Sequence, residues 1–214
     1  MTIAKEGIPF ITGTLVPGLI LMGLYPVHGM NILLIPGIIL MLLGVFCTAF
    51  FRNPNRKIPI DDSVLVSPAD GKVINVLEVN DEYVGEAIRV DIFLSVFDVH
   101  LNRIPTAGNV DFVKYRPGKF AAAFRDKAHE DNEKTDIGIS GDNGKFRVAQ
   151  IAGLIARRIV CYVKETETVR KGQLYGMIRF GSRTELTFPR NYEACVKVGD
   201  RVKGGESIIG KLKS

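Results

Sequence analysis

The residues with the clearest potential for covalent chemistry are Gly181 and Ser182, which form the only Gly-Ser pair of the chain, in the stretch GMIRFGSRTELTFP. A serine hydroxyl can attack the preceding carbonyl carbon and turn the amide into an ester. The step needs a base within hydrogen-bond reach and donors that polarise the bond. Glycine suits the acyl side because no side chain crowds the attacking oxygen. Taken alone, the pair also fits an ordinary turn.

The composition argues against several other kinds of site. Cys47, Cys161 and Cys195 are far apart, without a CxxC motif or a histidine at ligand spacing, so we expect neither a metal site nor a disulfide framework. An odd cysteine count suits a reducing compartment. The net charge is +5, but the basic residues do not form aromatic-interleaved stripes. We therefore expect an anionic membrane surface or acidic head group as partner, and no nucleic acid.

The N-terminal part reads as a membrane anchor. Residues 7–51 contain no Lys, Arg, Asp or Glu, and they hold two apolar runs, residues 8–25 and 31–51. Each run is close to the roughly 20 residues that a helix needs to cross a bilayer. The short link between them, which contains His28 as a polar loop residue, predicts a helical hairpin within residues 1–56. Basic residues flank both ends, which predicts that the remainder lies on the cytoplasmic side. The alternative is a pair of buried core helices.

Residues 57–214 read as a mainly β domain, because short β-type runs alternate with Gly, Pro, Asn and Asp. We expect strands at 63–67, 72–79, 87–95, 110–115, 147–151, 158–162, 173–180, 185–188 and 207–212. Residues 118–146 are polar and turn-rich, and predict a long functional loop or flap. The segments VRKGQLYGMI and VKGGESIIGKL echo each other, which favours a barrel-sandwich fold of the lipoyl or hybrid type. An ordinary β-sandwich without duplication is the alternative.

The context of the Gly-Ser pair narrows its interpretation. The motifs LVSPADGKV, FLSVFDVHLNRIP, HEDNEK, AQIAGLIARRI, GMIRFGSRTELTFP and VKVGDRVKGGESIIG occur in this order. The series resembles the phosphatidylserine decarboxylases, specifically their compact (type A) subgroup, from about Lys57 onward. The N-terminal hairpin suits the same subgroup.

The resemblance implies a proenzyme that cuts itself between Gly181 and Ser182, giving chains 1–181 and 182–214. After attack by Ser182, elimination and hydrolysis would leave a pyruvoyl group at the new N-terminus. Its carbonyl would form a Schiff base with the amine of phosphatidylserine and take up the electrons released when CO₂ leaves. The product would be phosphatidylethanolamine, and no metal or diffusible cofactor would be needed.

The resemblance also assigns roles to other residues. His100 would protonate the substrate or bind its carboxylate, since its pKa is near neutral. Larger members carry a second histidine for self-cleavage where this chain has Arg103. Either His100 takes that role, or Arg103 pairs with the lipid phosphate or carboxylate, which suits its planar fork. Asp70 would orient the imidazole in an Asp-His-Ser relay, although ADG is also a common turn.

The remaining candidates are substrate-binding residues. Asn132 and Glu133 match the NE pair of the family and would lie near the substrate or order a loop, whereas the neighbouring His129 reads as a surface residue. Arg183 would attract an anionic head group beside the pyruvoyl. A surface position is the alternative for each.

Two other functions stay open at this point. An archaetidylserine decarboxylase would meet the same head group on an ether lipid. A non-enzymatic, membrane-anchored lipoyl-like adaptor would share the anchor and the fold, but it should carry its soluble domain outside the cytoplasm. For the enzyme, the expected partners are the lipid substrate, the two chains of the proenzyme and a second copy in a homodimer. The expected location is the cell membrane.

Overall fold

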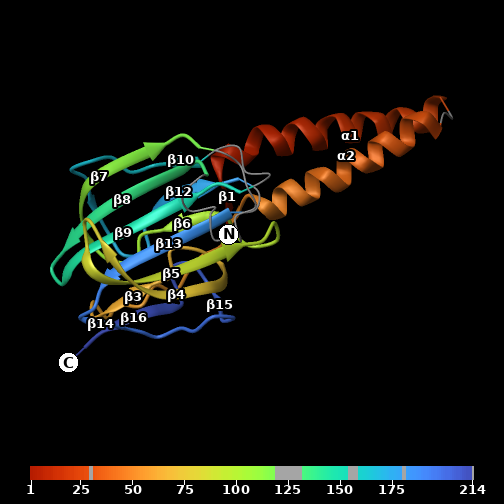
Figure 1. Ribbon diagram of the computed structural model, residues 1–214. Helices are drawn as coiled ribbons and strands as arrows, with labels where there is room; N and C mark the ends of the chain where they lie inside the picture. The colour runs from red at the N-terminus through yellow and green to blue at the C-terminus, as the bar shows by residue number, and fades with distance from the viewer. Residues whose placement is uncertain (29–30, 119–131, 154–158, 180–181, 214) are drawn as a thin grey trace. The chain divides into compact units, whose positions relative to one another are not determined.

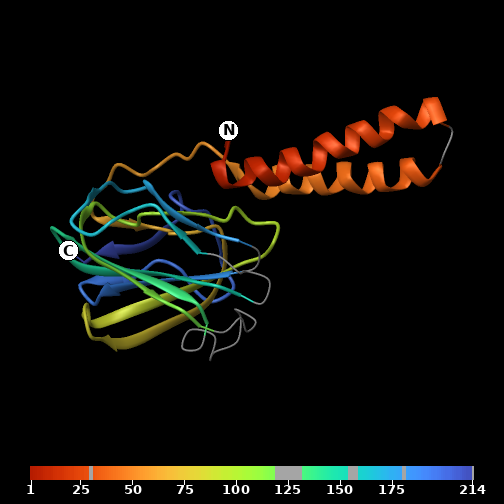
Figure 2. The same cartoon turned by 90° about the horizontal axis from the view of Figure 1, so that it is seen from above.

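The computed structural model describes residues 1–28, 31–118, 132–153, 159–179 and 182–213 (Figures 1 and 2). The chain divides into two compact units, Met1–Asn55 and Arg56–Ser214. Each unit has its own secondary structure and packing.

The first unit is a pair of long apolar helices, α1 (Ile8–His28) and α2 (Asn31–Phe50). The short η1 (Lys5–Gly7) precedes them, and β1 (Thr2–Ile3) pairs with β2 (Arg52–Asn53) at their base. Glycines let the helices approach closely, since a Cβ on Gly37 would lie 2.9 Å from Met22 Cγ and one on Gly44 would lie 2.2 Å from Leu15 Cδ2. The predicted pair of apolar helices is confirmed. His28 ends α1 and does not lie in the connecting turn.

Both helices are long and apolar enough to cross a membrane. The candidate spans are Lys5–Tyr25 and Ile32–Phe50, with mean hydropathies of 1.7 and 2.6. Only 11% and 17% of these spans are buried, which is unlike the core helices of a soluble domain. The hairpin therefore leaves most of its apolar surface for lipid or another apolar partner.

The second unit is built on an eight-stranded antiparallel sheet. Its strands, in spatial order, are β11 (Thr168–Val169), β7 (Gly108–Arg116), β8 (Lys134–Gly141), β9 (Gly144–Ile151), β13 (Ser182–Pro189), β5 (Gly85–Leu94), β4 (Gly71–Asp81) and β15 (Arg201–Val202). Two three-stranded sheets complete the unit. They are β10 (Ile159–Cys161), β12 (Leu174–Ile178) and β6 (Leu101–Arg103), and β14 (Tyr192–Ala194), β16 (Ile208–Leu212) and β3 (Val64–Val66).

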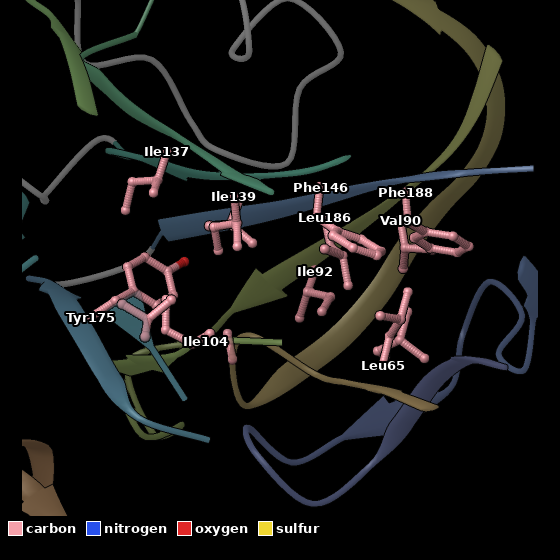
Figure 3. Close-up of a cluster of buried hydrophobic side chains, with 14 of the residues drawn as sticks. Leu65, Val90, Ile92, Ile104, Ile137, Ile139, Phe146, Tyr175, Leu186 and Phe188 are labelled. Carbon is pink, nitrogen blue, oxygen red and sulfur yellow. The ribbon is translucent and has the colours of Figure 1, made fainter. Parts of the chain in front are cut away.

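The main core lies between the long strands and the two small sheets (Figure 3). Alternate residues of each long strand face it, as the two-residue period of a strand requires. In β13 these are Leu186 and Phe188, which pack with Ile92 of β5 and with Leu65 and Tyr175 from the small sheets. Ser182 and Thr184 lie on the same face of β13 as Leu186 and Phe188. The polar residues at the start of this strand therefore face the same way as the core residues further along it.

The internal echo corresponds to repeated local structure. Gly172 and Gly205 occupy the same place in VRKGQ and VKGGE, and both have φ of +79°. A Cβ on either glycine would also collide with Ile58 Cδ1, at 2.6 Å and 2.8 Å. Each turn follows a two-residue edge strand and leads into the central strand of a small sheet, β12 or β16. Glycine is required at both positions for backbone conformation and for space.

The mainly β class and the N-terminal helices agree with the expectation, while the strand assignments need corrections. Residues 118–146 were expected to form a loop, but they contain β8 and the start of β9. The prediction was wrong here because Lys134 and Asp136 of β8 are buried as an ion pair. A strand is normally recognised in a sequence by alternating apolar residues, which this segment replaces with charged ones. The short strands β6, β11, β14 and β15 were also missed, since two or three residues carry too little pattern.

Candidate active site

Ser182 is the first residue of β13 and is fully buried. It is opposite Leu94, the last residue of β5. Because neighbouring strands are antiparallel, the first residue of one strand lies next to the last residue of its neighbour at this end of the sheet. We call this the Ser182 end of the sheet. Besides Ser182 and Leu94, it holds Gly71, Arg116, Lys134 and Ile151. Gly181 and His129 lie outside the described residues.

The segment from Leu94 to His100 connects the two strands that flank the Gly181-Ser182 bond in the chain. At one end Leu94 pairs with Ser182. At the other, the Ile178 N–H donates to the His100 carbonyl at 3.3 Å, extending the β12–β6 pairing. The described residues on both sides of the bond are therefore held by the backbone that carries His100.

The hydrogen bond of His100 favours one tautomer. Its side chain is buried, and Nδ1 lies 2.9 Å from the Asp98 carbonyl oxygen. A carbonyl can only accept, so this hydrogen bond requires a proton on Nδ1. In the neutral ring, Nε2 then carries the lone pair and can act as a base.

The Ser182 hydroxyl is buried, and Oγ has no hydrogen-bond partner in the described part of the chain. Buried hydroxyls are normally satisfied, so an open one calls for an explanation, and a chemical role is one of them. An oxygen that is not held by another acceptor or donor is suited to attack a neighbouring carbonyl.

Asn102 links β6, the strand that follows His100, to β13, the strand that begins at Ser182. Gln150 Nε2 donates to Asn102 Oδ1 at 2.8 Å, and Asn102 Nδ2 lies 3.5 Å from Thr184 Oγ1. Gln150 and Thr184 are paired residues of β9 and β13. The three polar side chains are almost fully buried, and together they fasten β6 to the large sheet two residues beyond His100 and two beyond Ser182.

Asp70 and Arg103 belong to a mixed-charge cluster with Arg56 and Glu206. Both Asp70 carboxylate oxygens accept from Arg56 Nη2 at 2.8 Å, and Oδ1 also accepts from the Gly204 N–H at 2.7 Å. Arg56 Nη1 lies 3.5 Å from Glu206 Oε2.

Arg103 Nη1 in turn donates to the Gly172 carbonyl at 2.9 Å. Burial lowers the pKa of Arg103 below its ordinary value, and the charge of Arg56 lowers it further, while Asp70 opposes the change. Arg103 also lies beside Gly205. The cluster thus joins β6, the strand that follows His100, to both of the repeated glycine turns.

Asn132 and Glu133 precede β8 at the Ser182 end. Asn132 Nδ2 donates to the Ala152 carbonyl at 2.7 Å, and the Ala152 N–H donates to the Glu133 carbonyl at 2.9 Å. Tyr115 donates its hydroxyl proton to Glu133 Oε1 at 3.2 Å. Both residues are buried, and their contacts fix the ends of β8 and β9 next to β13.

Arg183 points to the opposite face of β13 from Ser182 and enters a buried ion-pair network. Its guanidinium contacts Asp91 and lies 3.0 Å from Glu185. Lys134 Nζ continues the network, 3.4 Å from Glu185 and 3.3 Å from Asp136. Burial raises the pKa of Asp91 and Glu185 raises it further, whereas Arg183 and Arg89 oppose the increase.

Sequence reasoning missed Asp98, Asn102, Gln150 and Thr184 as supports of the site. The two-residue period could have found part of this set, because Asn102 follows His100 by two positions and Thr184 follows Ser182 by two. In the described part of the chain, no cluster of His, Cys, Asp or Glu could hold a metal ion. A surface cleft of about 920 Å³ is lined by Tyr83, Phe112 and Arg147 among others, and includes none of the predicted site residues.

The geometry defines a class of protein: a mainly β domain that buries a serine hydroxyl at a strand start, in a chain that begins with a pair of apolar helices. The family model for phosphatidylserine decarboxylase matches residues 43–210. The chain belongs to the phosphatidylserine decarboxylase family.

Individual relatives agree with the family match. The chain is 48% identical to a phosphatidylserine decarboxylase proenzyme of Carboxydothermus hydrogenoformans, over 91% of this chain and 93% of the relative. It is 46% identical to one of Symbiobacterium thermophilum, over 98% and 95%. It is 49% identical to one of Nitratidesulfovibrio vulgaris, over 81% of each. These matches favour neither the lipoyl-like adaptor nor the ether-lipid enzyme.

Proposed function

We propose that this chain is a self-processing, pyruvoyl-dependent decarboxylase that converts phosphatidylserine to phosphatidylethanolamine. The observation that carries the proposal is the buried Ser182 hydroxyl without a described hydrogen-bond partner, at the start of a strand held by the His100 segment. The substrate is inferred from the names of the relatives, and self-processing is inferred from their description as proenzymes.

Self-cleavage begins at Ser182. Its Oγ attacks the Gly181 carbonyl carbon, the C–N bond breaks and an ester forms. Loss of the Ser182 Cα proton then expels the Gly181 carboxylate and leaves a dehydroalanine at the new N-terminus. Hydrolysis of its imine tautomer releases ammonia and leaves the pyruvoyl group. Chains 1–181 and 182–214 result.

His100 is the base that we assign to this step. In the neutral ring, Nδ1–H donation to the Asp98 carbonyl leaves the lone pair on Nε2, and the ring belongs to the segment that pairs on both sides of the scissile bond. The same imidazole is suited to the decarboxylation, because it can return a proton to the carbon that loses CO₂. The pyruvoyl carbonyl supplies the electron sink for that reaction.

We assign supporting roles around Ser182 and His100 to the other predicted residues. We assign Asp70 and Arg103 to the cluster that positions the His100 segment, so that Asp98 and not Asp70 orients the imidazole in the uncleaved chain. Asn132 and Glu133 hold the neighbouring strand ends against the substrate site. Arg183 remains the candidate for the anionic head group, but its contacts with Asp91 and Glu185 must open before a ligand can replace them.

The hairpin is the proposed membrane anchor, with the β domain on the cytoplasmic side because Lys5 and the basic residues 52–57 flank it. A homodimer is the proposed assembly. Chemical cross-linking in membranes tests the assembly, and protease access in oriented vesicles tests the side.

Intact-mass measurement of the purified protein tests the central proposal. We expect two chains, the smaller one with a blocked N-terminus that borohydride reduces. Ser182→Ala should leave one uncut chain of 23.6 kDa without decarboxylase activity. Ser140→Ala is a matched control, because its hydroxyl is exposed and bonds to Asp111 on another strand. An uncut wild-type chain would contradict the proposal.

A further inference from the structure

The side-chain amide of Gln150 is fully buried, but only one of its two ends is hydrogen-bonded. Nε2 donates to Asn102 Oδ1 at 2.8 Å, which fixes the orientation of the amide. Oε1 is buried as well and accepts no hydrogen bond from the described residues. Leaving a buried acceptor without a donor is unfavourable, so this oxygen calls for an explanation.

A glycine on the facing strand makes room for the amide. A Cβ on Gly176 of β12 would lie 2.6 Å from Gln150 Nε2 and 2.9 Å from Oε1, and it would also collide with the Val160 carbonyl oxygen. Gly176 does not have a positive φ, so its backbone conformation alone does not demand glycine. Glycine is needed here for close approach, and the space that it leaves holds the Gln150 amide against β12.

Gln150 and Ser182 lie on the same face of the large sheet. Gln150 of β9 is paired with Thr184 of β13, and Ser182 precedes Thr184 by two residues (Figure 1). Gln150 and Ser182 are therefore diagonal neighbours on adjacent strands. The Cβ atoms of such neighbours are about 7 Å apart, a distance that a long side chain can span. Both side chains carry a buried oxygen that has no partner in the described part of the chain.

The chemistry proposed at position 182 gives these two oxygens different fates. The Ser182 hydroxyl oxygen leaves with the Gly181 carboxylate when the chain is cut, so it cannot satisfy Gln150 Oε1 in the processed protein. The Gln150 acceptor remains and needs a donor that arrives later. The amine of a serine head group is such a donor, and it has to reach residue 182 to react. The carboxylate and phosphate of the same head group are acceptors and cannot bond to another acceptor.

We infer that Gln150 Oε1 accepts a hydrogen bond from the amine of the serine head group and positions that amine beside residue 182. This role rests on the proposed function and adds the residue that recognises the reacting nitrogen. An uncharged acceptor suits the task, because it does not hold the amine in its charged form as a carboxylate would. The amide is also fixed in advance by Asn102, which lowers the entropy cost of binding.

A binding measurement without turnover tests this role. Borohydride reduction of the cleaved chain converts the ketone at residue 182 to an alcohol, so a serine lipid can bind but cannot react. Two short-chain ligands are compared: phosphatidylserine, and an analogue in which hydrogen replaces the amine. The reduced wild-type chain should prefer phosphatidylserine. Gln150→Met keeps the length of the side chain without its polar ends. It should weaken the binding of phosphatidylserine about tenfold or more, with a much smaller effect on the analogue.

Asn102→Ala is the matched control. It breaks the same hydrogen bond from the other side but keeps Gln150 Oε1, so the preference for the amine should survive even where both ligands bind less tightly. Gln150→Glu is a second test, because a carboxyl group keeps an acceptor at the same reach and should retain the preference. If Gln150→Met fails to fold or to be cleaved, the preference measured in Gln150→Glu decides.

Several results would overturn the role of Gln150. They are an equal loss on both ligands in Gln150→Met, an unchanged preference in that variant, and a preference lost in Asn102→Ala or in Gln150→Glu. An uncut wild-type chain without decarboxylase activity would reject the proposed function and this role with it. A cut and active chain whose preference does not depend on Gln150 would reject this role alone, so the two failures are distinguishable.

Discussion

The side chains of Asn102 and Thr184 meet between two sheets, with Nδ2 3.5 Å from Oγ1. Asn102 also accepts from Gln150, which is paired with Thr184. The contact lies two residues beyond His100 on one strand and two beyond Ser182 on the other. Because side chains alternate along a strand, the proposed nucleophile Ser182 extends from the same side of β13 as Thr184. A buried amide therefore ties the strand that follows His100 to the strand that begins at Ser182.

The first prediction concerns this amide. Asn102→Ala removes the acceptor of Gln150 Nε2 and leaves a buried donor unsatisfied, which costs about 1–3 kcal/mol of stability. Because the histidine segment loses its link to β13, self-cleavage should slow about tenfold or more. Gel analysis of a pulse-labelled chain measures the cleavage rate, and thermal unfolding in detergent measures the stability.

Asn191→Ala is the control for this prediction. Asn191 donates to the Asn143 carbonyl in an exposed turn away from the site, so neither quantity should change much. Wild-type cleavage kinetics in Asn102→Ala would show that the contact does not position the reacting groups.

The second prediction concerns Arg183. Its removal in Arg183→Ala leaves Asp91 and Glu185 buried without the cation between them. Breaking such a pair costs about 3–5 kcal/mol, because the remaining charges stay desolvated. Thermal unfolding in the Ser182→Ala background measures this cost without interference from cleavage.

A double variant tests the electrostatic cause. Arg183→Met with Asp91→Leu removes one charge of each sign, so it should recover a large part of the stability lost in Arg183→Ala. Equal stability of Arg183→Ala and the parent chain would mean that the network does not hold β13.

The overall class could be predicted from the sequence, since two charge-free runs and many short β-type runs are strong local patterns. The strand β8 could not, because Lys134 and Asp136 are buried as an ion pair and imitate a polar loop. The periodicity of the sequence also could not predict that the backbone segment carrying His100 lies next to Ser182. This proximity depends on the pairing of two sheets, and only the resemblance to the family pointed to it. The engagement of Arg183 by Asp91 is equally tertiary, since 92 residues separate the two along the chain.

The third prediction concerns Arg103, which stands where larger family members carry a second histidine. Its guanidinium donates to Gly172 and lies in the cluster of Arg56, Asp70 and Glu206. An imidazole is too short to keep these contacts, so Arg103→His should lower the unfolding temperature and should not accelerate self-cleavage. Cleavage half-time and thermal unfolding are the measurements. Faster cleavage with unchanged turnover would instead assign position 103 to processing.

The last prediction is a pH dependence of stability at Glu206. Its pKa is lowered mainly because the carboxylate accepts the Lys57 N–H, at 2.9 Å, and further because Arg56 is close. A carboxyl whose folded pKa lies below its unfolded value stabilises the fold above the unfolded pKa, and this contribution is lost as pH falls through the folded pKa. With an unfolded pKa of about 4.3, the loss should occur below about pH 5.

Glu206→Gln should therefore reduce stability at pH 7 and approach the wild type near pH 3, when both are measured by chemical unfolding of the Ser182→Ala chain. Glu193→Gln is a matched control on an exposed strand position. Because Glu206 anchors the Gly205 turn against the Arg56 cluster, the acid-sensitive step should also loosen the cluster around Arg103. A constant difference between wild type and Glu206→Gln from pH 7 to pH 3 would show that the carboxylate charge is not the source of its contribution.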